Sequence, residues 1–204
     1  QQHGQRESPA NARRCAIILP SNKRGTMNQR QCITASSTVE DILAHNRSFV
    51  EQREFERYVT DKYPDKKLAI VSCMDTRLTE LLAAALGLKN GDAKIIKVAG
   101  GEVSHPFGSV MRSLLIAVCE LGVEDVMVVA HTNCGAQHMS GASMVENMKR
   151  LGVSSERIDF ARHCGIDFDH WLAGFGDTEE AVRKSVDMVR AHPVMLRTCA
   201  SRAA

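Results

Sequence analysis

Three short apolar segments alternate with amphipathic segments, and this alternation constrains the fold more than any other feature of the sequence. Residues 68–71, 95–99 and 126–130 have the length and composition of strands buried within a sheet. Between them, residues 79–86 and 109–121 place apolar side chains at helical spacing. Strands that alternate with helices form parallel sheets. We therefore expect an α/β fold with three layers, in which helices flank mainly parallel central strands.

Further helices are expected on both sides of this region. Residues 37–40, Ser-Thr-Val-Glu, have the pattern of a capping box and precede apolar residues at helical spacing, which predicts a helix that Tyr63-Pro64 ends. Residues 137–149 also have a helical pattern. Residues 177–180, Asp-Thr-Glu-Glu, predict the start of a last helix, which His192-Pro193 should end.

The N-terminal segment differs in charge from the rest of the chain. Its first thirty residues contain six Lys and Arg side chains and one acid. Such a segment is compatible with an organelle transit peptide, or with a disordered extension or translated upstream sequence, in which case Met27 is the natural start of the protein. We expect residues 1–36 to be an N-terminal extension and residues 37–204 to form a single catalytic domain. The predicted location is the cytoplasm, with organelle import as the alternative.

Composition excludes several classes of function. With 26 Lys and Arg against 24 Asp and Glu, the chain lacks the basic excess of proteins that bind nucleic acid through its phosphates. It has no uncharged apolar run of about eighteen residues, so no membrane span is expected. Its seven cysteines are an odd number, which rules out a complete intramolecular disulfide set and favours a reducing compartment. Thiols are then available as ligands or nucleophiles.

Two of the predicted strands run directly into polar motifs. Cys73-Met-Asp75-Thr-Arg77 follows the first strand, and His131-Thr-Asn-Cys134 follows the third. Parallel neighbouring strands end at the same edge of a sheet, where α/β folds bind ligands, so the two motifs are expected to meet. Two thiolates and one imidazole suit zinc, and three protein ligands leave its fourth position for water. Each motif alone is weak evidence, because it could equally be core residues or a surface ion pair.

Other candidate residues support simpler interpretations. His105 and His138 could carry protons to solvent, but structural or surface roles are more typical of single histidines. The adjacent pair His163-Cys164 does not make a metal site by itself. Cys119 lies in an apolar helical segment and is expected in the core.

Together, the two motifs resemble those of the β-class carbonic anhydrases, C-x-D-x-R followed by H-x-x-C. The resemblance extends over roughly residues 39–193 and includes residues 97–101 and 105–112. It is strongest to the short, compact members, a group that includes related carbonyl sulfide hydrolases. It implies a bound zinc ion and a catalytic dyad; the implied metal ligands are Cys73, His131 and Cys134, and the implied dyad is Asp75 and Arg77.

The resemblance also implies an activity, which is the reversible hydration of carbon dioxide to bicarbonate by zinc-bound hydroxide. It implies a homodimer or a larger homo-oligomer as well. Val98, Gly100 and Gly101 would line the substrate pocket, although the two glycines could equally form a turn after the second strand. Family members often carry Asn at the position of Val98 and Asp at that of Asn133, so the polar contacts of the pocket differ here.

Two alternative functions remain open at this point. The same ligands could serve hydrolysis of carbonyl sulfide or carbon disulfide, and the apolar Val98 favours this weakly. The chain could also bind zinc or bicarbonate without turnover. A last departure from the family is the segment that follows Pro193, where an edge strand is expected to be missing or irregular.

Overall fold

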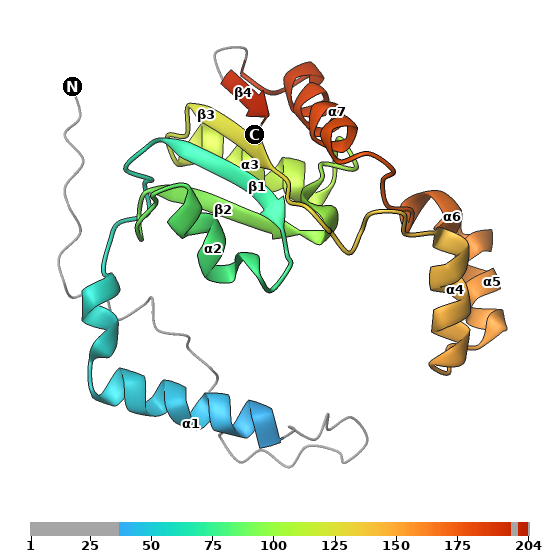
Figure 1. Cartoon of the computed structure of the whole chain (residues 1–204), viewed down its shortest axis with the longest axis horizontal. Helices are drawn as coiled ribbons and strands as arrows, with labels where there is room; N and C mark the ends of the chain where they lie inside the picture. The colour runs from blue at the N-terminus through green and yellow to red at the C-terminus, as the bar shows by residue number, and fades with distance from the viewer. Residues whose placement is uncertain (1–36, 197–199, 204) are drawn as a thin grey trace. The chain divides into compact units, whose positions relative to one another are not determined.

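The computed structural model describes residues 37–196 and 200–203, which fall into two compact units (Figure 1). The first unit, which ends at Asp61, contains helix α1 (Ser37–Glu51) and the short 3-10 helix η2 (Glu54–Tyr58). The expected N-terminal helix is thus present. It ends well before Pro64, because Arg53 adopts a left-handed conformation with φ of 57°. The division of the chain at residue 36 stays a prediction.

The second unit begins at Lys62 and is built on a parallel sheet. Its strands are β1 (Leu68–Cys73), β2 (Ala93–Val98), β3 (Asp125–Val129) and β4 (Ala200–Ala203), in the order β2-β1-β3-β4. All three pairings are parallel, which confirms the predicted α/β class. The expectation of a missing edge strand after Pro193 was wrong, because β4 pairs with β3 along that edge.

The strands differ in burial according to their place in the sheet. β1 lies between two neighbours, and residues 69–73 are buried on both faces as expected. β2 is an edge strand and is only partly covered. Ile95 is 44% exposed and Lys97 is exposed, so the prediction of a fully buried second strand was wrong. An edge strand has a neighbour on one side only, which explains this difference.

Three helices pack around the sheet (Figure 1). They are α2 (Leu78–Ala85), α3 (Ser109–Glu120) and α7 (Thr178–Ala191), each within one or two residues of its expected range. α3 and α7 contribute to the main core with β1 and β3. Cys119 is exposed and not in this core, contrary to expectation. The buried face of α3 includes Val118, and the next residue points about 100° away from it.

Three short helices follow β3 and form a small cluster of their own. They are α4 (Gly141–Arg150), α5 (Ser155–His163) and α6 (Phe168–Trp171). Val145, Ile158 and Phe168 bury the contact between them. The sequence predicted only α4, and it placed the start at residue 137. In the structure residues 137–140 are a loop, and the Ser140 side chain caps the helix by accepting from the N–H of Ser143.

Helix length also bears on membrane association. None of the helices formed by residues 37–196 combines the length and the apolar character that a membrane span requires.

Candidate metal centre

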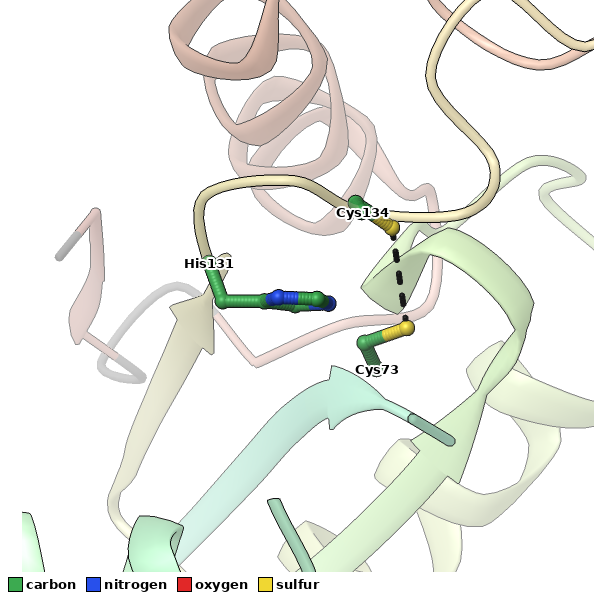
Figure 2. A group of neighbouring side chains, drawn as sticks. All are labelled: Cys73, His131 and Cys134. Atoms are coloured by element: carbon green, nitrogen blue, oxygen red, sulfur yellow. Dashed lines mark hydrogen bonds between the residues drawn. The ribbon is translucent and has the colours of Figure 1, made fainter. Parts of the chain in front are cut away.

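Two thiols and an imidazole meet at the carboxyl edge of β1 and β3. Cys73 is the last residue of β1, while His131 and Cys134 lie in the loop that follows β3. Their ligand atoms all lie within 4.8 Å of one another, and the two Sγ atoms are 3.7 Å apart. Figure 2 shows the imidazole edge and the two sulfur atoms turned toward one point. The predicted convergence of the two motifs is therefore present in the structure.

The imidazole of His131 is arranged as a metal ligand would be. Its Nδ1 lies 2.9 Å from the carbonyl oxygen of Thr132. A carbonyl oxygen only accepts, so Nδ1 carries the proton and Nε2 offers a lone pair. Nε2 is buried and has no hydrogen-bond partner among the described residues. Metal-ligating histidines characteristically donate their other N–H in this way, and an unpaired buried acceptor is otherwise costly. The donor set therefore fits a soft or borderline divalent cation such as zinc.

Asp75 lies beside this group and is fixed by Arg77. The guanidinium donates two hydrogen bonds to the carboxylate, from Nε to Oδ1 at 2.9 Å and from an Nη to Oδ2 at 2.7 Å. The backbone N–H of Arg77 donates a third, to Oδ1 at 2.9 Å. The same guanidinium donates to the carbonyl oxygen of Asn133, which links the two motifs directly. Asp75 Oδ2 then lies 4.0 Å from His131 Nε2, so the carboxylate is next to the three ligand atoms.

Hydrogen bonds and burial shift the pKa values of Asp75 and Cys134. Hydrogen bonds from the Arg77 side chain, followed by that from its backbone N–H, hold the pKa of Asp75 far below its usual range. Burial raises the pKa of the Cys134 thiol, and a hydrogen bond from the N–H of Ala136 opposes this rise. A bound cation reverses such a rise, because it stabilises the thiolate directly. Asp75 is thus an anion and an acceptor throughout the neutral pH range.

Apolar side chains surround the two thiols. Cys73 and Cys134 are 5% and 6% exposed, and they pack with Leu78 and Leu82 of α2. Ala136 and Phe175 complete the cluster. These contacts shield the sulfur atoms from water, which strengthens electrostatic interactions within the site.

The predicted pocket residues lie at the end of β2, where Val98 is the last residue, and in the turn that follows, which contains Gly100 and Gly101. Gly100 and Gly101 have φ of 72° and 70°, which glycine adopts without strain. A Cβ on Gly101 would lie 2.9 Å from the backbone nitrogen of Cys73, so only glycine permits this close approach. Val98 pairs in register with Cys73 and packs against the main core. The glycines therefore form the turn and also place the chain directly against Cys73.

The remaining sequence candidates lie outside this group. His105, His138, His163 and Cys164 are all exposed. In the described part of the chain, one group of three or more His, Cys, Asp or Glu side chains could hold a metal ion, and it consists of Cys73, His131 and Cys134. The sequence analysis did not anticipate the carbonyl contact of His131 or the link from Arg77 to Asn133. Asn133 has a left-handed φ of 53°. The sequence signal for a tight turn there was the residue type itself, because asparagine tolerates this conformation.

Comparisons with known proteins show which sequences and folds this chain resembles. A sequence model of the carbonic anhydrase family matches residues 68–203. A Bacillus subtilis (strain 168) protein named "Putative carbonic anhydrase YtiB" is 52% identical over 158 residues, which cover 78% of this chain and 84% of that protein. The crystal structure of β-carbonic anhydrase isoform I from Trichomonas vaginalis has 31% identity and a TM-score of 0.73, covering 82% of this chain and 91% of that one. A carbon disulfide hydrolase from Acidithiobacillus thiooxidans is 24% identical over 172 residues, covering 78% and 77% respectively.

Proposed function

The chain belongs to the β-carbonic anhydrase family, and we propose that it catalyses the reversible hydration of carbon dioxide to bicarbonate at a zinc ion held by Cys73, His131 and Cys134. The observation that carries this proposal is the buried, unpartnered Nε2 of His131, which faces two buried thiols and has the Arg77-bound carboxylate of Asp75 beside it. This arrangement combines a metal-binding donor set with an oriented acceptor.

The metal and the acceptor have separate tasks in the reaction. A zinc ion held by Cys73, His131 and Cys134 would act as a Lewis acid and would make hydroxide available from water near neutral pH. Asp75 accepts a hydrogen bond at Oδ2 from the attacking oxygen and so orients it toward the carbon. Arg77 keeps the carboxylate ionised and turned toward the site through its paired hydrogen bonds. The pairing also keeps Asp75 from occupying a metal position itself.

The surroundings of the site serve substrate access and exclusion of water. Leu78, Leu82 and Phe175 give the thiols an apolar wall, which suits an uncharged, weakly hydrated substrate. Gly100 and Gly101 present backbone in place of side chains beside Cys73. Charged bicarbonate is held less well by such walls, which favours its release.

A second candidate is hydrolysis of carbonyl sulfide or carbon disulfide at the same ligands. The apolar wall around the thiols supports it, because sulfur is larger and less well hydrated than oxygen. A carbon disulfide hydrolase is also among the relatives, at lower identity than the protein named as a carbonic anhydrase. We place carbon dioxide first for this reason. Zinc or bicarbonate binding without turnover is the weakest of the three, since the Asp75–Arg77 pair would then have no task.

Parallel assays separate these activities. Stopped-flow measurement of proton release from carbon dioxide should show rapid hydration by the zinc-loaded protein, and sulfide release from carbonyl sulfide and carbon disulfide should be slow. Dominant sulfide release would instead establish the second candidate. The absence of both reactions in protein that contains zinc would overturn the proposed enzymatic function.

The homodimer and the cytoplasmic location stay predictions. Two exposed apolar residues support the homodimer, Phe107 just before α3 and Ile116 within it.

A further inference from the structure

A half-buried carboxylate, Glu102, lies beside the metal centre and is not one of the residues that the two motifs contain. It follows Gly101 directly, in the turn after β2. Its Oε2 lies 2.9 Å from the position that a Cβ on Gly100 would occupy. Glu102 thus fills the space that the absent side chain of Gly100 leaves, and Gly100 itself has a left-handed φ of 72°.

The same space borders the apolar wall of the thiols. The Cβ of Ala136 and the Cε1 of Phe175 each lie 3.3 Å from that point on Gly100. Ala136 in turn donates its N–H to the Cys134 sulfur. Ala136 and Phe175 also pack against Cys73 and Cys134, so the Glu102 carboxylate borders side chains that surround the two thiols, and it is not itself in the ligand group.

The turn that carries Glu102 also lies against α7. The N–H of the next residue, Val103, donates to the buried Oγ of Ser185 at 3.0 Å, which fixes the turn against this helix. Lys184 of α7 is the charged group that acts on Glu102. The Nζ of Lys184 forms an exposed salt bridge with Glu180, so the side of Glu102 on which Lys184 acts is in contact with solvent. In residues 37–196 no donor hydrogen-bonds the Glu102 carboxylate, which leaves it available for water.

We propose that Glu102 transfers protons between the metal centre and solvent. Hydration of one carbon dioxide by one water yields one bicarbonate and one proton. The proton passes through water to Oε2 of Glu102, which becomes neutral. Glu102 then releases the proton to a buffer base on the side of Lys184 and returns to its anionic form. No electrons are exchanged, and the inference rests on the proposed hydration activity.

The electrostatic surroundings suit this task. Burial raises the pKa of Glu102, and the cation of Lys184 opposes this rise. Glu180, bound to Lys184, is the other charged group on that side, while Ala136 and Phe175 contribute no charge. A pKa moved upward from the ordinary range brings the group closer to the working pH, where an acid and base exchanges protons most effectively.

The first test is the Glu102→Gln variant of the zinc-loaded chain, assayed by stopped flow at low and high imidazole buffer. We expect kcat to fall by at least about tenfold at low buffer, kcat/KM to stay unchanged, and high imidazole to restore kcat. The exposed Glu124→Gln, whose partner Lys67 lies just before β1, is the matched control and should behave as the unsubstituted chain. A loss of kcat and kcat/KM together, without recovery by imidazole, would overturn the inference. Absence of hydration in the unsubstituted chain would instead overturn the proposed function, and the inference with it.

A second measurement does not depend on turnover. NMR of 13C-carboxyl-labelled glutamate, with the Glu102 signal identified by its loss in Glu102→Gln, should show this carboxyl titrating above ordinary glutamate. The midpoint should rise further in Lys184→Met, because the opposing cation is removed. A Glu102 carboxyl that titrates in the ordinary range and does not respond to Lys184→Met would show that it is solvated away from this site and would overturn the inference.

Discussion

Cys134→Ala should abolish metal binding and lower the thermal stability of the chain at the same time. In the proposed site Cys134 is one of three protein ligands, and metal binding free energy is linked to folding. A linkage of about 4 kcal/mol, typical for free metal at ~1,000 times Kd, corresponds to a fall in Tm of about 8–16 °C for a chain of this size. Elemental analysis of the purified variant and thermal unfolding followed by circular dichroism measure the two effects.

The control for this variant is Cys119→Ala. Cys119 is an exposed thiol on α3, so its substitution by alanine should leave both metal content and Tm unchanged. A chelator-treated comparison adds a second check, because the Tm values of Cys134→Ala and the unsubstituted chain should converge once metal is removed from both. Full zinc occupancy in Cys134→Ala would refute the assignment of this ligand.

Asp75→Asn should keep its zinc and lose most of its turnover, with kcat lower by about a hundredfold or more. Asparagine preserves the shape of the side chain but not the charge, so its oxygen is a weaker acceptor for the attacking water. The bidentate pairing with Arg77 is also lost, which leaves the side chain free to rotate. Stopped-flow hydration and elemental analysis of the same preparation separate the loss of turnover from any loss of metal.

Asp92→Asn is the matched control for this experiment. The side chains of Asp92 and Asp75 are similarly shielded, at 15% and 17% exposed, but Asp92 pairs with Lys66 at the start of β2. Its substitution should leave kcat unchanged. If Asp75→Asn keeps full turnover, the Asp75–Arg77 pair is only a structural ion pair.

The low pKa of Asp75 also makes the stability of the fold depend on pH. Because Arg77 lowers the pKa in the folded chain, the pairing stabilises the fold fully above the unfolded value of about 3.9, and this contribution is lost as the pH falls through the lower folded pKa. Across the neutral range Asp75 therefore does not change its charge.

The sheet and the ligand group were predictable because both depend on local patterns. A buried strand that ends at Cys73 and another that leads to His131 must bring these residues together if they pair in parallel, as β1 and β3 do. Asp75 and Arg77 were expected as a dyad from the family resemblance, and the structure pairs their side chains through two hydrogen bonds.

Other features depend on tertiary contacts that a sequence pattern does not contain. The exposed position of Cys119 follows from which face of α3 meets the sheet. The half-exposure of Ile95 follows from the position of β2 at an edge. The place of the Glu102 carboxylate depends on Gly100, because its Oε2 takes up the space that a side chain on Gly100 would occupy. Its sequence neighbourhood is that of an ordinary surface acid.

X-ray absorption at the zinc edge of the purified, unsubstituted chain tests the central claim most directly. We expect about one zinc per chain, with two sulfur atoms at about 2.3 Å, one histidine nitrogen at about 2.0–2.1 Å and one further light atom in the fourth position. A metal shell without sulfur, or protein that binds no zinc when supplied with it, would contradict the assignment of Cys73, His131 and Cys134 as a metal centre.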